Sequence, residues 1–197
     1  MNEKFFIYKT ASLKSEKPDL SFVPMMTRRK LSPIARITFA LMNECCGENN
    51  VNLVFSSQFG EVDRLEALIL QYTDDGEVSP ISFGSSVHNA AVGAFSLFRN
   101  IKNKYNAISA GKNSLSAGFL DAACEKEKTI FCYSDTIPDF RGAACLVGRE
   151  FEQGADEIEL TAAQNRTDNT EYERFLKFLN KETDEFNAPF YTARRVK

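Results

Sequence analysis

The stretch ISAGKNSLSAG, residues 108–118, predicts the end of a strand, a turn of small residues and the start of a helix. Ile108 ends the apolar strand, and Leu115, Phe119 and Ala122 follow the turn at helical spacing. This arrangement places a helix N-terminus at the edge of an α/β sheet, where backbone N–H groups and the helix dipole stabilise a developing anion. The stretch therefore predicts an α/β fold with a nucleophile elbow, and it raises the question of which residue is the nucleophile.

Apolar runs and helical periods alternate along the rest of the chain. Short apolar runs predict strands over residues 5–13, 51–57, 129–135, 143–148 and 157–163. Helical spacing predicts helices that begin after Ser32 and end near Gly47, around 65–69, over 86–98 and over 172–179. The alternation predicts a single α/β domain over residues 1–197, with a largely parallel or mixed sheet and helices on both faces. Residues 187–197 are predicted to form a loosely ordered tail.

The composition argues against several classes of protein. A net charge of −3, with acidic and basic residues interspersed, gives no general attraction to nucleic acid or to an anionic membrane. No apolar run approaches the roughly 18 residues of a membrane-spanning helix, and the first residues lack a signal-peptide core, which predicts a cytoplasmic location. Five cysteines without a CxxC pair and a single histidine supply no zinc site of ordinary spacing. No metal and no cofactor are therefore expected.

Ser109 and Lys112, within the turn, match the SxxK pattern in which a lysine deprotonates a serine nucleophile. A motif this short has a high rate of chance matches, and the SDN and KTG motifs that complete such a site are absent from the sequence. The pair remains the candidate nucleophile and base of an acyl-transfer or hydrolytic enzyme, which is one alternative for the function.

His88 and Asn89 lie in the segment GSSVHNAAVG. A lone histidine among small and apolar residues more often hydrogen-bonds backbone groups inside a fold than acts as an acid or base. His88 is therefore predicted to be structural, and Asn89 is predicted to cap a helix or to join two loops.

Arg28, Arg29 and Lys30 form a short basic cluster directly before a predicted helix. Such a cluster is most often a solvated face, and three residues fall short of the longer basic stretches that indicate anion binding. The functional alternative is a docking site for an acidic partner or a phosphate.

The cysteines offer no well-placed nucleophile. Cys124, near the end of its helix, and Cys132, in the middle of a strand, are expected to behave as small buried hydrophobes. Cys45 and Cys46 are expected at a helix C-terminus, where the dipole disfavours a thiolate. Since a reactive thiolate needs cationic neighbours or a helix N-terminus, none of these cysteines is predicted to react.

Three segments together resemble the N-terminal half of β-ketoacyl synthases, the condensing enzymes of fatty-acid and polyketide assembly, which have a thiolase-like fold. These segments are RRKLSPIARITFALMNEC (28–45), SPISFGSSVHNAAVGAF (79–95) and NAISAGKNSLSAGFLDAA (106–123). The resemblance runs from Met25 to Gly148 and places Asn89 and Gly93 on the family's asparagine and glycine. It extends to the short chain-length-factor-like proteins of aryl polyene gene clusters, which have similar SVHNA and LSAG stretches.

The same resemblance implies that the active site is missing. In the family, the third segment carries a nucleophilic cysteine, and that position falls on Lys112 without a gap or on Gly111 with one gap. Neither residue can form a thioester. The family also uses two histidines in its C-terminal half, and His88 is the single histidine of this chain. The resemblance therefore implies a ketosynthase-like protein without condensation chemistry.

Chain-length factors are a precedent for such a protein, because they pair with an active ketosynthase and shape the tunnel that receives the growing chain. The resemblance implies a non-catalytic subunit that pairs with an active β-ketoacyl synthase, or with itself, and helps to set acyl chain length in aryl polyene, fatty-acid or polyketide synthesis. It implies partner contacts from Phe95, Leu97 and Phe98, for which a place in the ordinary core is an alternative of at least equal weight. It also implies docking of an acidic acyl carrier protein on the basic cluster. A half-length fold also predicts an exposed apolar face. A free-standing acyl-chain binding protein, with a pocket inside the monomer, is the remaining alternative.

Overall fold

The computed structural model describes residues 2–47, 50–165 and 168–196. Its strands are β1 (Asn2–Leu13), β2 (Asn52–Ser56), β3 (Tyr105–Ile108), β4 (Thr129–Asp135), β5 (Arg141–Gly148), β6 (Asp156–Ala162), β7 (Glu185–Asn187) and β8 (Tyr191–Arg195). Its helices are α1 (Met25–Arg28), α2 (Pro33–Cys45), α3 (Val62–Asp75), α4 (Pro80–Gly84), α5 (Ala90–Arg99), α6 (Ser114–Cys124) and α7 (Glu171–Leu179). Ser32 caps α2 as predicted, since its Oγ accepts a hydrogen bond from the Ala35 N–H at 3.1 Å.

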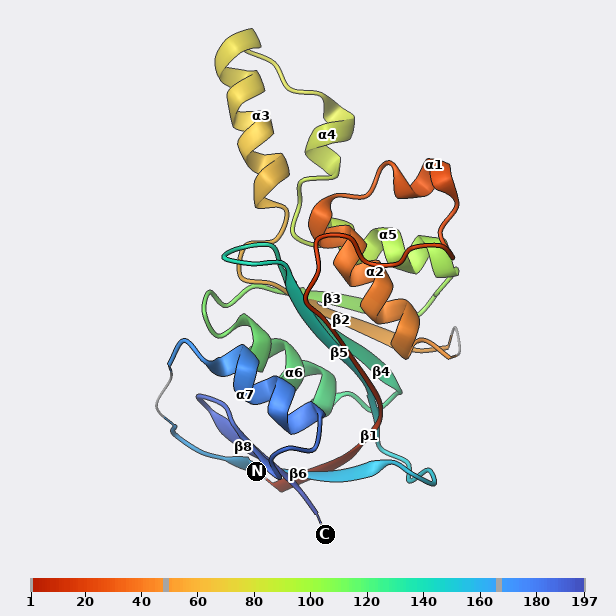
Figure 1. The fold of residues 1–197 in the computed structure, drawn as a ribbon, viewed down its shortest axis with the longest axis vertical. Coiled ribbons are helices and arrows are strands. Elements are labelled where there is room, and N and C mark those ends of the chain that lie inside the picture. Colours follow the sequence, from red (N-terminus) through yellow and green to blue (C-terminus); the bar gives the residue numbers. More distant parts are fainter. Residues whose placement is uncertain (1, 48–49, 166–167, 197) are drawn as a thin grey trace.

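The described strands form one mixed sheet in the order β3-β2-β4-β5-β1-β6-β8-β7. β2 is parallel to β3 and to β4, and the other neighbours are antiparallel. Parallel strands need crossover connections. Helices α3 to α5 connect β2 to β3, and α6 connects β3 to β4, which lies on the other side of β2. Helices α2 and α5 cover one face of the sheet, and α6 and α7 cover the other (Figure 1). The predicted α/β class, with a mixed sheet between two helical layers, is confirmed.

Strand β4 contributes to both cores. Phe131 and Tyr133 belong to the core beneath α6 and α7, whereas Ile130 and Cys132 belong to the core beneath α2 and α5. Successive side chains of a strand point to opposite faces of the sheet, so a strand covered on both faces needs a nearly continuous apolar run. The sequence TIFCYSD meets this requirement, and every residue of β4 is buried. The centre of the sheet is therefore closed to solvent on both sides.

Helix α6 approaches the sheet closely at Gly118. A Cβ added there would lie 2.6 Å from the Ser56 Cβ and 2.8 Å from the Phe131 Cε2, both shorter than real carbon contacts. We expect Gly118→Ala to lower the free energy of unfolding by about 1–3 kcal/mol because the helix must move off the sheet, although alanine is the better helix former. Urea denaturation measures this, with Gly84→Ala as the matched control.

Gly84 has no atom within 4 Å of its added Cβ, so Gly84→Ala is expected to change stability by less than about 0.5 kcal/mol. Equal effects of the two substitutions would contradict the close approach of α6 to the sheet.

The structure corrects the prediction of a loosely ordered tail over residues 187–197. Residues 191–195 form β8, which pairs with β6 and β7. Tyr191 and Ala193 are buried, and the Tyr191 hydroxyl donates a hydrogen bond to the Ser116 carbonyl at 2.9 Å. These contacts depend on elements far away in the sequence, and a strand of five residues ending in Arg-Arg carries little signal of its own. Residues 191–195 are thus part of the sheet.

Helices α3 and α4 form a hairpin that projects beyond the C-terminal end of β2 (Figure 1). We call residues 62–84 the α3–α4 hairpin. Leu68 is the buried residue of α3. The helix predicted over 86–98 begins at Ala90, because the residues just before it form turns. Within the described residues, no helix combines the length and the apolar character that crossing a bilayer requires.

Candidate functional site

The elbow has the predicted strand, turn and helix. β3 ends at Ile108, Gly111 adopts a left-handed φ of +57°, and α6 begins at Ser114. The Ser114 Oγ accepts a hydrogen bond from the Ala110 N–H at 3.0 Å and donates one to the Gly111 carbonyl at 2.6 Å. Glycine suits the left-handed position because a Cβ there is strained. The turn is therefore held by residues of the stretch itself.

Ser109 and Lys112 do not form a catalytic pair in this turn. Ser109, Gly111 and Lys112 are exposed. Within the described part of the chain, neither the Ser109 hydroxyl nor the Lys112 ammonium takes part in a hydrogen bond or an ion pair. A general base must lie within hydrogen-bond reach of the proton it removes. Lys112 therefore does not activate Ser109 in this arrangement.

A cavity of about 290 Å³ opens beside the elbow. Lys112 and Leu115 form one side of it, and Arg141, Glu171 and Tyr172 lie on another. Burial raises the pKa of Tyr172 to about 12, so this hydroxyl stays protonated at neutral pH and donates to the Gly142 carbonyl at 3.0 Å. Burial also raises the pKa of Glu171. The lining contains no cysteine or histidine among the described residues, so the cavity has no thiol chemistry.

Three of the cysteines are buried and unreactive. Burial raises the pKa of Cys45 to about 12 and holds those of Cys132 and Cys145 well above the usual value. A thiol must ionise to attack, so these side chains are inert near neutral pH. Cys124 corrects the expectation of a buried hydrophobe, because it is exposed at the C-terminal end of α6. It lies at the opposite end of that helix from the elbow.

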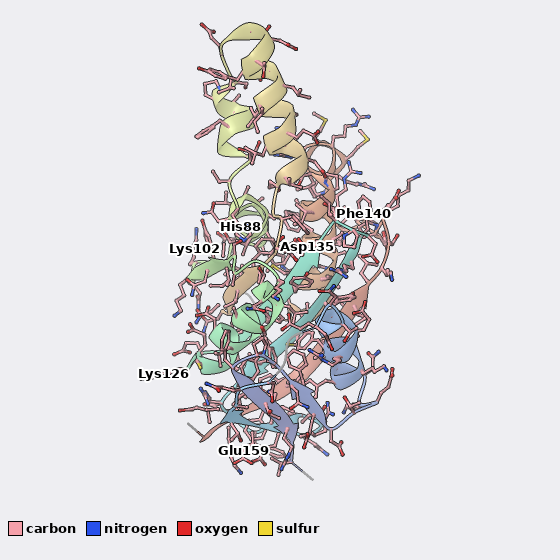
Figure 2. The ribbon with its side chains drawn as sticks, turned by 90° about the vertical axis from the view of Figure 1, so that its left-hand side faces the viewer. His88, Lys102, Lys126, Asp135, Phe140 and Glu159 are labelled. Atoms are coloured by element: carbon pink, nitrogen blue, oxygen red, sulfur yellow. The ribbon has the colours of Figure 1, made fainter. Side chains whose placement is uncertain are left out.

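His88 joins the elbow to the loop that follows β2. Its Nε2 lies 2.9 Å from the Ile108 carbonyl oxygen, and its ring packs on Phe55 with centroids 5.5 Å apart. A Cβ added at Gly60 would lie 2.6 Å from the His88 Nδ1, so the ring fills the space above that glycine. Figure 2 shows His88 at the same end of the sheet as Asp135, the last residue of β4. These contacts give the ring a structural role.

Asn89 and Gly93 lie at the start of α5. Asn89 occupies the N-cap position, where its side chain makes no capping hydrogen bond, and its carbonyl accepts from the Gly93 N–H at 3.0 Å. A Cβ added at Gly93 would come within 3.3 Å of the Tyr105 Oη, which links α5 to β3. The side chain of Asn89 therefore does not cap α5, and Gly93 leaves room for Tyr105 of β3 to lie close to this helix.

The family model for the β-ketoacyl synthase N-terminal domain matches residues 8–134, which is more than half of the chain. The chain belongs to this β-ketoacyl synthase family. No curated protein matches it. The match includes the elbow, and the family assignment therefore covers the segment in which Gly111 and Lys112 stand.

Solved structures with the same fold agree with this assignment. One is described as a ketosynthase (ApeO) in complex with its chain length factor (ApeC) from Xenorhabdus doucetiae, with a TM-score of 0.73 and 20% identity over 91% of this chain and 84% of that chain. Another is described as a type II PKS acyl-carrier protein in complex with its ketosynthase bound to the hexaketide (AntDE:AntF), with a TM-score of 0.59 and 11% identity over 90% and 75% of the two chains. The alignments cover large shares of both partners, so this β-ketoacyl synthase family chain has the same fold as chains of similar length.

Asp135 is a site residue that the sequence interpretation missed. It is fully buried at the end of β4, and its Oδ1 accepts hydrogen bonds from the Ser57 Oγ at 2.5 Å and the Phe59 N–H at 3.1 Å. Its Oδ2 accepts from the Gln58 N–H at 3.1 Å. The carboxylate therefore anchors the loop after β2, and Gly60 of this loop lies against the His88 ring. The sequence held one signal for this role, because the apolar run TIFCYSD ends in a polar residue, Asp135.

The three residues expected to contact a partner lie in different surroundings. Phe95 is fully buried and packs edge-on against Phe39 with ring centroids 5.3 Å apart, so the expectation of a surface contact is wrong for Phe95. Phe98 is half-buried, with its ring 5.5 Å from that of Phe39. Leu97 is 83% exposed. Leu97 is therefore the side chain of this group that a partner can reach directly.

The basic cluster lies at the end of α1. Arg28 is half-buried, and Arg29 and Lys30 are exposed. Their side chains have no ion-pair partner among the described residues. The neighbouring Met25 and Met26 are more than half exposed. The cluster is therefore accessible to an anionic ligand or partner.

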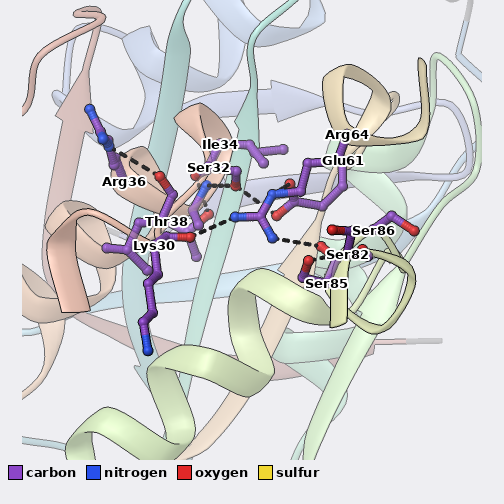
Figure 3. A network of polar contacts seen from close by, with 12 residues as sticks. Lys30, Ser32, Ile34, Arg36, Thr38, Glu61, Arg64, Ser82, Ser85 and Ser86 are labelled. Atoms are coloured by element: carbon purple, nitrogen blue, oxygen red, sulfur yellow. Dashed lines mark hydrogen bonds and ion pairs between the residues drawn. The ribbon is translucent and has the colours of Figure 1, made fainter. Parts of the chain in front are cut away.

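A polar network holds the root of the α3–α4 hairpin (Figure 3). The Arg64 guanidinium donates hydrogen bonds to the Ser85 carbonyl at 3.2 Å and to the Lys30 carbonyl at 2.6 Å. Its Nε lies 3.5 Å from the carboxylate of Glu61, which also accepts a hydrogen bond from the Ser32 hydroxyl at 2.8 Å. Arg64 thus ties both ends of the hairpin to the segment before α2.

The network makes stability depend on pH. Burial raises the pKa of Glu61 above its ordinary 4.5, with smaller opposing effects from Ser32 and Arg64. A carboxyl with a raised folded-state pKa favours folding most below pH 4.5, and this contribution is lost as the pH rises through the folded-state pKa. We expect Glu61→Gln to remove this decline, so that the variant's stability rises relative to wild type from pH 4.5 to pH 7.

Chemical denaturation across this pH range measures the slope. Glu66→Gln, which changes an exposed carboxyl of α3, the helix that follows Glu61, is the matched control. A wild type and a Glu61→Gln variant with parallel profiles would contradict the assignment of this titration to Glu61.

Proposed function

We propose that this chain is a non-catalytic β-ketoacyl synthase-like subunit that pairs with an active ketosynthase in the cytoplasm and influences the length of the acyl chain produced. The pathway class is aryl polyene, fatty-acid or polyketide synthesis. The observation that carries the proposal is the elbow, which keeps its strand, turn and helix. The resemblance to the family puts Gly111 or Lys112 at the nucleophile position of this elbow. A condensing enzyme needs a thiolate at that position, whereas a subunit that shapes its partner's tunnel needs only the fold.

The exposed apolar surface supports the pairing. Soluble monomers rarely expose large contiguous apolar patches, and those they expose often mark protein interfaces. The α3–α4 hairpin carries several exposed large apolar side chains, and Leu97 lies exposed on α5. The similarity in fold and length to a chain of the ketosynthase–chain length factor complex adds to this support.

The proposed contacts are Leu97 and Phe98 for the ketosynthase and Arg28, Arg29 and Lys30 for an acidic acyl carrier protein. The first pair borders an apolar groove, and the basic cluster lies next to that groove. Adjacent placement would let a carrier protein approach while the synthase is bound.

Co-expression with a ketosynthase encoded nearby tests the pairing. We expect the two chains to co-purify, and Leu97→Glu to weaken the complex without loss of thermal stability, because this side chain is exposed. Phe151→Glu is the control, since Phe151 is 73% exposed on the loop between β5 and β6. Failure of the wild-type chains to co-purify would contradict the proposal.

Intact-protein mass spectrometry distinguishes this proposal from a serine enzyme at Ser109 and Lys112. After incubation with an acyl thioester, we expect the acyl adduct on the ketosynthase and none on this chain. A stable adduct on this chain, lost in Ser109→Ala, would instead establish acyl transfer at the elbow.

The groove also favours one second candidate, a free-standing acyl-chain binding protein. It has a volume of about 440 Å³ and is lined mainly by apolar side chains, including Leu31, Phe39 and Phe98. Such a protein would bind a fluorescent fatty acid in the absence of any partner. No saturable binding by the isolated chain would remove this candidate.

A further inference from the structure

The cavity beside the elbow contains two buried polar groups that lack partners. The Oε1 atom of Glu171, the first residue of α7, is buried and has no hydrogen-bond partner among the described residues. The Nε atom of Arg141, the first residue of β5, is in the same state. Both side chains line the cavity of about 290 Å³, and Glu171 is only 9% exposed. Since buried polar groups in folded proteins nearly always have partners, two such groups in one cavity indicate a ligand that binds both.

The carboxyl group of Glu171 suits a cationic donor. Burial raises its pKa, and the Ser116 hydroxyl and the charge of Arg174 have smaller opposing effects. Arg174, one turn further along α7, forms an ion pair with Asp168 at 2.7 Å, so its charge is shared. An ammonium group that donates a hydrogen bond to the free Oε1 atom would satisfy this oxygen and stabilise the charged carboxylate.

Arg141 and Lys112 suit an anion. The Arg141 Nη1 lies 3.6 Å from the Asp139 carboxylate, which is longer than a hydrogen bond, and its Cζ lies 5.2 Å from the centre of the Tyr172 ring. Lys112 is exposed on the elbow side of the cavity and has no ion-pair partner in the part of the chain that the structure describes. A guanidinium presents a planar set of donors that matches the two oxygens of a carboxylate. The two cations therefore favour a carboxylate ligand.

Most of the remaining wall is apolar or aromatic. Leu115 and Phe59 contribute to it, together with the rings of Tyr133 and Tyr172, whose centroids lie 6.0 Å apart. The Tyr172 hydroxyl already donates to the Gly142 carbonyl, so its ring offers the cavity an apolar surface. Sites for drug-sized ligands measure roughly 300–1,000 Å³, so this cavity matches a smaller molecule. The ligand that fits combines an ammonium group, a carboxylate and an apolar body in a small volume.

We propose that this cavity binds a free α-amino acid with an apolar side chain, whose ammonium group donates to Glu171 and whose carboxylate accepts from Arg141 and Lys112. The apolar side chain then packs against Leu115 and the ring of Tyr172. Each charged group of the ligand meets an opposite charge, so neither unpartnered group of the cavity stays buried without a hydrogen bond. This site belongs to the isolated chain and does not rest on the proposed pairing with a ketosynthase.

Isothermal titration calorimetry of the purified full chain with three matched compounds tests the class of ligand. L-phenylalanine has both charged groups, phenethylamine lacks the carboxylate, and 3-phenylpropionate lacks the ammonium group. We expect L-phenylalanine to bind saturably and each of the other two compounds to bind about 30-fold more weakly or worse, because each leaves one charged group of the site unpaired. Equal binding of 3-phenylpropionate would indicate a site for simple carboxylic acids and would overturn the amino-acid assignment.

Two substitutions test which residue recognises which group. We expect Glu171→Gln to weaken the binding of L-phenylalanine by about 30-fold and to abolish its preference over 3-phenylpropionate. Arg141→Gln should abolish the preference over phenethylamine, and Arg141→Lys, which keeps the charge, should restore part of it. Glu173→Gln, which changes an exposed carboxyl of the same helix, is the control and should bind as wild type does.

Circular dichroism of each variant checks that the fold is kept. A folded Glu171→Gln variant with the wild-type preference for L-phenylalanine would contradict the contact with the ammonium group. Titration of the wild type with L-leucine extends the test to an aliphatic side chain. No saturable binding of L-phenylalanine or L-leucine up to about 10 mM would overturn the site itself.

The amino-acid site and the proposed function fail by different results. If the chain bound L-phenylalanine and no ketosynthase co-purified with it, the site would stand and the proposed function would fail. If the chain bound a ketosynthase and neither amino acid, the proposed function would stand and the site would fail.

Discussion

Phe119→Ala is expected to lower the free energy of unfolding by about 3–5 kcal/mol, the loss measured for large aromatic side chains removed from cores. Phe119 is fully buried on α6, and its ring centroid lies 5.0 Å from that of Phe175 and 5.8 Å from that of Phe5. It also lies within 6.5 Å of the rings of Phe186 and Tyr191, in the last strands. One side chain therefore connects α6, α7 and both ends of the chain.

Urea denaturation of wild type, Phe119→Ala and Leu97→Ala measures this effect. Leu97 is 83% exposed and its truncation should change stability by less than about 0.5 kcal/mol. A loss below about 1 kcal/mol for Phe119→Ala would mean that the aromatic cluster is not the centre of this core.

Asp135→Ala is expected to cost about 3–5 kcal/mol, because it removes a buried charged acceptor and leaves its donors without partners. The Ser57 hydroxyl and the N–H groups of Gln58 and Phe59 donate to this carboxylate. The Ser57 Oγ in turn accepts from the Gly60 N–H at 2.7 Å. Loss of Asp135 therefore loosens the whole loop between β2 and α3, including the root of the hairpin.

Asp139→Ala is the control for this substitution. Asp139 forms a partly exposed ion pair with Lys14 at 3.1 Å, and such pairs contribute about 0–1 kcal/mol. Hydrogen exchange should show faster exchange at the Gln58 and Phe59 amides in Asp135→Ala. Unchanged exchange and a loss of stability equal to that of Asp139→Ala would show that the carboxylate does not hold this loop.

Local patterns predicted the fold where the structure depends on local chemistry. A few neighbouring residues are enough to predict the conformation of three elements. These are the helix start at Ser32–Pro33, the buried strand β4 and the small-residue turn at Gly111. These elements lie within the segment from α2 to β5. In this segment the predicted strands and the helix α2 agree with the structure, whereas α4 was not predicted and α5 begins later than expected.

Features that depend on distant partners were missed. β8 becomes a strand because β6, about thirty residues earlier, offers it an open edge, and Tyr191 packs against α6. The burial of Asp135 depends on the loop after β2, which lies far away in the sequence. Neither the pairing of β8 nor the burial of Asp135 can be predicted from the neighbouring residues in the sequence.

The sequence also could not predict which of the candidate partner residues are exposed. Phe95 and Leu97 are two positions apart on α5, so at about 100° per residue they point to nearly opposite sides of the helix. One side packs on Phe39 and the other faces solvent. Composition marks both as apolar, and the placement of α5 against α2 decides which of them a partner can reach.

The product-length profile of a reconstituted ketosynthase tests the central claim most directly. Mass spectrometry of the products would compare the synthase and carrier protein alone, with this chain, and with its Ser109→Ala variant. We predict that the chain shifts the distribution of acyl lengths and that Ser109→Ala shifts it equally, because the elbow contributes shape and no nucleophile. An unchanged distribution, or a shift that disappears in Ser109→Ala, would contradict the account.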